Sequence, residues 1–373
     1  MKTVPKSKIA DLLDLWARSA VLYAPLHNGA IAEFARWDET ARDSLALETV
    51  STHLSPKSLL FPQTEALYEF KCPGTSLEVM PLPPPSQPAV AVGLRSCDVR
   101  AFHLLDAVFL TGGFVDNNYQ VRRDNLTIVG MACRQPLDTC FCTSFGIDPS
   151  AVEGSDAVLY DLGDCLGIEA RTAKGEKLLA EGESLLTEKE VPKPPPVACE
   201  FNLDLRGVRE ALTEMFDHPL WEKLSLRCLG CGTCTYVCPA CYCFDIQSKV
   251  RGDEGYRFRC WDSCMYPEYT LMAGGHNPRP TRKERVRQRF MHKLCYFPER
   301  YGEFLCTGCG RCLQHCPVGL DIVEVIRLVQ AEAALKNREE KPGEEAPLSL
   351  SAAVCDLEKE VAAGEGGEQV EHR

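Results

Sequence analysis

The length, composition and charge of the chain describe an ordinary folded protein with room for two or three domains. It has 373 residues, of which 45% are hydrophobic and 25% are charged, as in typical globular proteins. The formal net charge of −12 argues against nucleic-acid binding. The sequence has no apolar run of about 18 residues, so we expect no membrane span.

Cysteine is unusually frequent, with 21 in the chain. In a secreted protein this number would predict disulfides, but residues 1–20 lack the apolar centre of a signal peptide. The spacing of the cysteines also suits metal binding. We therefore expect reduced thiols in a cytoplasmic, anaerobic setting.

The chain is predicted to begin with a helical segment over residues 1–60. Ile9, Leu12, Leu13 and Trp16 recur there at helical spacing. Further on, the proline-rich run at residues 80–88 predicts an extended connector, because proline fits neither regular element.

An α/β domain is predicted over residues 61–190. The short apolar segments at 89–94 and 126–131 each predict a buried strand, the first of them followed by an amphipathic helix. Residues 156–171 predict a strand pair, and residues 175–190 predict a further amphipathic helix.

Four cysteines of this domain predict a metal centre. Cys97 and Cys133 each follow a predicted strand, at the edge where open α/β sheets place ligands, and Cys140 and Cys142 come shortly after. We expect these four thiols to hold a third [4Fe–4S] cluster, in addition to the two described below. The alternative is four small buried hydrophobic side chains. Three arginines beside these cysteines could offset the negative charge of a cluster or simply lie at the surface, namely Arg95, Arg100 and Arg134.

A linker and a helical domain are predicted next. The proline-rich segment at residues 191–200 is the clearest linker in the chain. Residues 201–335 are predicted to form a helical, ferredoxin-like domain. Residues 336–373 form an acidic tail with too few apolar residues to build a core, and we expect it to be mobile. The predicted fold class is therefore mixed α+β, with an N-terminal α/β domain followed by an α-helical two-cluster domain.

One cysteine motif occurs twice in the helical domain. It reads C-x2-C-x2-C-x3-C-P, as CLGCGTCTYVCP at residues 228–239 and as CTGCGRCLQHCP at 306–317. In bacterial two-cluster ferredoxins the fourth cysteine of such a run binds the other cluster. The predicted ligands are Cys228, Cys231, Cys234 and Cys316 for the first [4Fe–4S] cluster, and Cys306, Cys309, Cys312 and Cys238 for the second. Zinc is the alternative, but zinc sites usually combine two separated C-x2-C pairs.

The long insert between the motifs carries two further features. Its length suits a helical two-cluster module rather than a compact ferredoxin. The basic segment at residues 276–293 is either a solvated helix face, a support for anionic clusters or a docking surface for an acidic partner. Five cysteines of the insert could bind a further metal or lie buried as small hydrophobic residues, namely Cys241, Cys243, Cys260, Cys264 and Cys295.

These motifs together resemble a known family. The chain is similar to the sulfhydrogenase beta subunit and the anaerobic sulfite reductase A subunit in GLRSCDVRAFHLLD, CRQPLDTCFC, CPACYCFD, RCWDSC, GHNPRPTRKERVRQR and the two cluster motifs. The resemblance covers about residues 61–326. It implies an electron-transfer subunit that works beside a flavin-binding, NAD(P)H-oxidising subunit. The terminal partner it implies is a hydrogenase, a sulfite reductase or a heterodisulfide-reductase-type subunit.

The predicted function is therefore the transfer of single electrons, with no bond-making catalysis in this chain. A self-contained oxidoreductase with its own flavin or nicotinamide is one alternative. Against it, the chain has no G-x-G-x-x-G after a strand and no P-loop, so we expect it to bind no flavin or NAD itself. A redox sensor or a scaffold with structural clusters is the other alternative.

Overall fold

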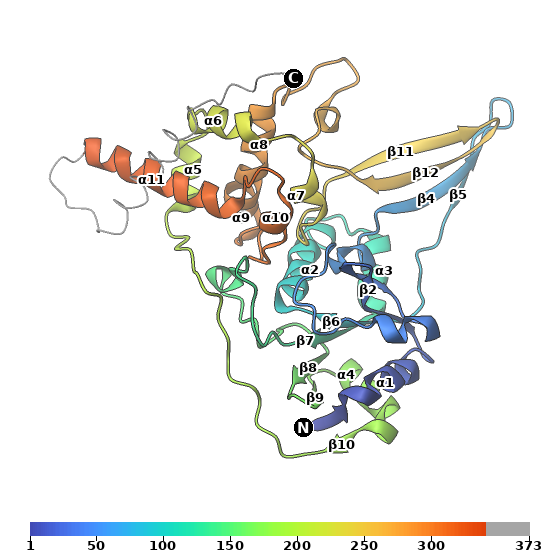
Figure 1. Cartoon of the computed structure of the whole chain (residues 1–373). Helices are drawn as coiled ribbons and strands as arrows, with labels where there is room; N and C mark the ends of the chain where they lie inside the picture. The colour runs from blue at the N-terminus through green and yellow to red at the C-terminus, as the bar shows by residue number, and fades with distance from the viewer. Residues whose placement is uncertain (341–373) are drawn as a thin grey trace, which may run out of the picture.

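The computed structural model describes residues 1–340 and contains two β-sheets and a helical C-terminal region (Figure 1). The larger sheet has eight strands in the order β10-β1-β9-β8-β7-β6-β2-β3. Its four central strands, β2, β6, β7 and β8, run parallel to one another, and antiparallel strands flank them on both sides. In chain order the strands of this sheet are β1 (Lys2–Pro5), β2 (Val21–Asn28), β3 (Ile31–Arg36), β6 (Ala89–Leu94), β7 (Leu126–Met131), β8 (Ala157–Asp161), β9 (Cys165–Ala170) and β10 (Thr187–Glu188).

Helices cover both faces of the larger sheet. On one face, α1 (Ile9–Trp16) and α4 (Ala173–Glu181) form a core with alternate residues of the central strands. The indole of Trp16 joins the two helices by donating to the Leu178 carbonyl at 2.8 Å. On the other face, α2 (Ser96–Phe109) and α3 (Asn117–Asn125) form a second core. The N-terminal part is thus a helix–sheet–helix sandwich, as an α/β domain requires.

The prediction of a helical segment over residues 1–60 is wrong beyond α1 and a few short 3-10 turns. Strands β1, β2 and β3 lie in this segment and belong to the larger sheet. Residues Val21 to Tyr23 pair in parallel with β6, so neighbouring strands supply the hydrogen bonds that local sequence does not indicate. The strands predicted at 89–94 and 126–131 and the strand pair at 156–171 are present as β6, β7, β8 and β9.

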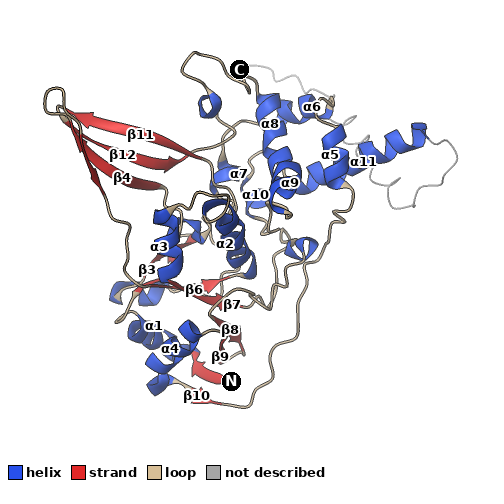
Figure 2. Cartoon of the chain, turned by 180° about the vertical axis from the view of Figure 1, so that it is seen from behind, coloured by secondary structure: helices blue, strands red, loops and turns tan. Residues whose placement is uncertain are grey.

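The prediction of a purely helical C-terminal domain is wrong, because part of that domain forms a smaller β-sheet. It has the order β11-β12-β4-β5 and is antiparallel throughout. Its strands β11 (Phe244–Arg251) and β12 (Glu254–Trp261) form a hairpin within the cluster-motif insert. This hairpin pairs with β4 (Thr64–Lys71), which is followed by β5 (Glu78–Pro81). Figure 2 shows this sheet extending from the body as an arm.

The helical region surrounds the two cysteine motifs. Residues 191–200 contain no helix or strand, in line with the predicted linker, and connect the larger sheet to this region (Figure 1). None of the helices in the described part of the chain is long and apolar enough to cross a membrane. The helices are α5 (Val208–Glu214), α6 (Leu220–Arg227), α7 (Thr233–Tyr236), α8 (Arg282–Met291), α9 (Phe297–Tyr301), α10 (Arg311–His315) and α11 (Ile322–Glu340), with one π-helical turn at His292–Tyr296. Of the acidic tail predicted at residues 336–373, residues 336–340 belong to the end of α11, and residues 341–373 lie outside the described residues.

A buried ion pair joins the helical region to the larger sheet. Arg311, at the start of α10, donates to Asp98 on α2 at 2.8 Å, and each side chain is only 1% exposed. The guanidinium also donates to the carbonyl and hydroxyl oxygens of Thr52. Asp98 accepts in addition from the backbone N–H of Arg95 at the start of α2. One side chain therefore connects the second cysteine motif to the N-terminal sandwich.

We expect Arg311→Met to destabilise the protein strongly, because the variant leaves the Asp98 carboxylate buried without its cation. Breaking a buried pair from one side costs about 3–5 kcal/mol. The control is Arg100→Met, because the Arg100–Glu303 pair also connects α2 to the helical region but is more than 40% exposed on both sides, and such pairs contribute about 1 kcal/mol or less. Thermal unfolding of oxygen-free protein measures both variants. Equal shifts in melting temperature would contradict the role of Arg311.

Candidate metal centres

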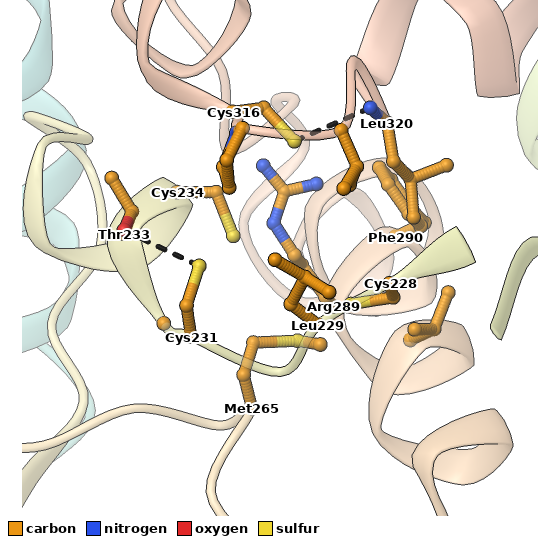
Figure 3. Close-up of a pocket in the computed structure, with 14 residues that line it drawn as sticks. Cys228, Leu229, Cys231, Thr233, Cys234, Met265, Arg289, Phe290, Cys316 and Leu320 are labelled. Carbon is orange, nitrogen blue, oxygen red and sulfur yellow. Dashed lines mark hydrogen bonds between the residues drawn. The ribbon is translucent and has the colours of Figure 1, made fainter. Parts of the chain in front are cut away.

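The first thiol set surrounds a single cavity (Figure 3). Cys228, Cys231 and Cys234 reach it from the loop before α7 and from α7 itself, and Cys316 reaches it from the end of α10. The structure thus brings together the four cysteines predicted for the first cluster, including the crossed one. The rest of the lining is mainly apolar, with Met265, Val286, Phe290 and Leu320.

Backbone geometry allows the first motif to curl around this cavity. Gly230 and Gly232 have φ angles of 72° and 76°, a region that favours glycine. The N–H of Gly230 points to the Cys228 sulfur at 3.4 Å, and the N–H of Leu320 points to the Cys316 sulfur at 3.2 Å. Such hydrogen bonds to sulfur orient the ligands of a metal centre and tune it.

The second thiol set lies between α7, α10 and the π-helical turn, with Cys238 buried and the other three cysteines partly buried. Cys306, Cys309 and Cys312 lie before and within α10, and Cys238 comes from the first motif. Burial raises the pKa of Cys306 to about 12, and the charge of Cys238 adds to the effect. Cys238 also raises the pKa of the Cys309 and Cys312 thiols, after burial as the main cause. The four cysteines predicted for the second cluster therefore lie within each other's electrostatic field.

Two buried cations from the basic segment face these thiol sets. The Lys293 ammonium lies 3.3 Å from the Cys238 sulfur and donates to the Leu305 carbonyl. Arg289 lines the first cavity, and Figure 3 shows its guanidinium pointing between the thiols. Burial opposes the charge of Arg289, but the thiols of Cys234 and Cys312, one from each set, raise its pKa. These two side chains favour the interpretation that the segment supports anionic centres.

An anionic group fits this site. The Nε and Nη1 atoms of Arg289 are buried without a hydrogen-bond partner, which is costly for a charged group. Thiolates around an iron–sulfur cluster would place negative charge beside that guanidinium. Among residues 1–340, no group of three or more His, Cys, Asp or Glu side chains could hold a single metal ion. A cluster with several irons is larger than one ion, so its ligands stand further apart.

The four cysteines of the N-terminal domain also line one cavity. Cys97 begins α2, Cys133 follows β7, and Cys140 and Cys142 come from the next loop. Because β6 and β7 are parallel, their carboxyl ends deliver Cys97 and Cys133 to the same edge of the sheet. The structure thus brings together the residues predicted for a third cluster, although this geometry alone does not identify what they bind.

Of the three arginines expected near these cysteines, only Arg95 lines the cavity. It is buried, and its guanidinium donates to four carbonyl oxygens, including those of Met131 and Ala132. Arg100 forms an exposed ion pair with Glu303, and Arg134 is exposed. Arg311 lines the cavity as well, although its place within the second cysteine motif gives no sign of this position.

A fifth thiol near this cavity was also missed. The sulfur of Cys199 lies 3.5 Å from that of Cys142, and Cys199 forms a small buried cluster with Cys140 and Cys142. It belongs to the proline-rich linker, where a single cysteine has no spacing partner. Its nearness to Cys142 depends on the path of the linker across the fold, so no local signal could have identified it.

The second thiol set and the N-terminal cavity are neighbours. Cys309 lines the N-terminal cavity together with Cys97 and Cys140. The loop that carries Cys309 packs closely against the N-terminal domain, because a Cβ atom at Gly308 would come within 2.5 Å of the Phe141 carbonyl. The N–H of Phe141 in turn donates to the Gly308 carbonyl at 2.8 Å. The second thiol set therefore lies between the first set and the N-terminal set.

Comparisons with known proteins identify one domain and the family of the chain. A family model described as a 4Fe-4S dicluster domain matches residues 227–320, which include both cysteine motifs. The chain is 33% identical over 315 residues to the sulfhydrogenase 2 subunit beta of Pyrococcus furiosus, over 82% of this chain and 91% of that protein. No solved structure matches the chain significantly. The chain thus contains a 4Fe-4S dicluster domain and belongs to the family of the sulfhydrogenase beta subunit.

Proposed function

We propose that this chain is an iron–sulfur electron-transfer subunit of a cytoplasmic, multi-subunit oxidoreductase. It relays single electrons between a flavin-containing, NAD(P)H-oxidising subunit and a terminal redox subunit. The name of the Pyrococcus furiosus relative favours a hydrogenase as the terminal partner, before a sulfite reductase or a heterodisulfide-reductase-type subunit. The main support for the proposal is that three thiol sets lie next to one another within one chain.

The proposed ligands are those that the structure brings together. Each [4Fe–4S] cluster supplies one-electron redox chemistry when bound. The first is assigned to Cys228, Cys231, Cys234 and Cys316, the second to Cys306, Cys309, Cys312 and Cys238, and a third to Cys97, Cys133, Cys140 and Cys142.

The remaining residues of the sites exclude water and supply positive charge. Phe290 and Leu320 cover the first set with apolar surface, and Phe141 is buried against the loop of the second. Arg289 lies in the field of both sets, and Arg311 lies between the second and the N-terminal one. Buried cations stabilise reduced, more negative centres, because charges interact strongly where water is excluded.

The two ends of the series differ in exposure. Cys231 of the first set is exposed, whereas Cys133, Cys140 and Cys142 of the N-terminal set are buried. Leu229, beside the first set, is 61% exposed. We propose one contact with a redox partner at the first set, because one of its cysteines and the neighbouring Leu229 reach the surface.

The third cluster is tested by iron and labile-sulfide analysis of oxygen-free protein. The double variant Cys133→Ser/Cys140→Ser removes two of its four proposed ligands, and we expect a loss of about four irons per chain with equivalent sulfide. The control is Cys165→Ser on β9, a free cysteine outside the thiol sets, which should lose none. An unchanged iron content in the double variant would contradict the third cluster.

The role of Arg289 is tested by a redox titration followed by electron paramagnetic resonance. We expect Arg289→Met to lower the reduction potential of the first and second clusters, because the variant removes a buried cation that favours the reduced state. The control is Arg287→Met on the same helix, since Arg287 stacks on Phe216 and donates to its carbonyl oxygen and does not line the first cavity. Potentials that are unchanged or raised in Arg289→Met would contradict this role.

A further inference from the structure

The arm formed by the smaller sheet has two edges that differ in their protection. Strand β5 forms one edge, has four residues and ends at Pro81, and three further prolines follow at residues 83–85. Short strands and prolines keep a sheet edge from pairing with another chain. Strand β11 forms the other edge with eight residues and no proline, and every residue after Phe244 is exposed. The edge of β11 is therefore open to a further strand.

The pairing within the hairpin determines which backbone groups of β11 face this open edge. Arg251 and Glu254 flank a two-residue turn, so they form a hydrogen-bonded pair. Such pairs alternate along an antiparallel ladder, and the N–H of Asp262 accordingly donates to the Cys243 carbonyl at 3.0 Å. The odd-numbered residues of β11 thus bond to β12. The residues whose backbone groups face outward are Phe244, Ile246, Ser248 and Val250.

The side chains along this strand alternate between its two faces. Ile246 and Val250 lie on one face and are 40% and 61% exposed. The other face carries Asp245 near the base of the arm and Arg251 at its tip. The Asp245 carboxylate accepts from the Ile246 N–H and from the Gln247 amide. Within residues 1–340, neither Asp245 nor Arg251 forms an ion pair, so the strand has a negative and a positive end.

These features make β11 complementary to a second copy of itself. Across a two-fold axis, residue i of one copy meets residue j of the other, and j meets i. An axis at Ser248 places Asp245 of each copy opposite Arg251 of the other. The same axis places Ile246 opposite Val250, and outward backbone groups then meet outward groups, as an antiparallel ladder requires. Opposite charges and apolar side chains that face each other in this way stabilise a sheet.

The arm makes this strand accessible to a second molecule. Figures 1 and 2 both show β11 along the outer side of the arm, which extends from the body. Only the base of the strand is held by the body, where Phe244 contacts the ring of Phe61. An antiparallel pair places the two bodies at opposite ends of the joint sheet. Residues 245–251 can therefore pair with those of a second copy without a collision of the two bodies.

We propose that two copies of this chain associate through β11, so that their four-stranded arms form one continuous sheet. A second copy fits this edge because the same strand supplies both members of each charged pair and of each apolar pair. The association goes beyond the proposed function, since it involves none of the cysteines of the three thiol sets.

Charge reversal tests the proposal on the full-length, oxygen-free chain, with mass measured by sedimentation velocity at several concentrations. We expect the wild-type chain to form a dimer as its concentration rises. Asp245→Arg sets like charges opposite each other and should abolish the dimer. The double variant Asp245→Arg/Arg251→Asp restores opposite charges and should recover it. The matched control is Glu78→Arg on β5, an exposed change of the same charge at the other edge, which should leave the dimer unchanged.

A backbone variant tests the same contact without a change of charge. Ser248→Pro removes an outward N–H group and leaves the bonds between β11 and β12 in place, so it should abolish the dimer. Iron content, measured on each variant, should equal that of the wild-type chain and shows that the variant is folded.

Two results would overturn the proposal. One is a wild-type chain that stays monomeric at every concentration, including the case in which the β11 amides become protected from hydrogen exchange only when a different subunit is added. The other is a dimer that Asp245→Arg leaves intact. Either result leaves the proposed function untouched, because iron content and redox signals test that function separately.

Discussion

The packing around the thiol sets depends on one constraint, which is that buried positive charges need negative charge beside them. Lys57, Arg289, Lys293 and Arg311 are all less than 5% exposed, and each must face negative charge to be tolerated in the interior. Arg311 meets a carboxylate, Asp98. Arg289 and Lys293 lie in the field of thiols instead, and the Lys57 ammonium donates to the carbonyl oxygens of Thr235 and Cys241. Cysteines that bind anionic clusters explain why these cations are inside the fold.

The topology brings the thiols to these cations from distant parts of the chain. Parallel strands of the larger sheet end at one edge and deliver Cys97 and Cys133. The second cysteine motif packs on that edge through the backbone at Gly308 and through Arg311. The sandwich and the helical region therefore pack directly against each other, so that thiols of both regions line one cavity.

The sequence alone predicted what depends on spacing and local pattern. The repeated four-cysteine motif predicted both C-terminal thiol sets, because the crossed pattern of ligands is a property of the motif. The strands at 89–94 and 126–131 were predicted because they are short and apolar. The hairpin was missed, although Phe244, Ile246 and Val250 alternate with polar residues and a turn with Gly252 at a φ of 62° follows.

Features that depend on long-range packing could not be predicted. The Asp98–Arg311 pair joins residues 213 positions apart, and nothing near either residue indicates its partner. Cys199 lies in a linker, and its position beside Cys142 follows from the path of that linker. The burial of Arg289 and Lys293 within a basic segment was left open for the same reason, since a solvated helix face has similar composition.

The central claim is that this chain conducts electrons through clusters held by its cysteine thiols. Stepwise reduction of oxygen-free protein with dithionite, followed by electron paramagnetic resonance and then by reoxidation with a dye acceptor, tests this claim most directly. The account predicts signals of reduced, mutually interacting clusters that appear with added electrons and disappear when the dye accepts them. Protein that is colourless and free of iron, or clusters that never accept an electron, would contradict it.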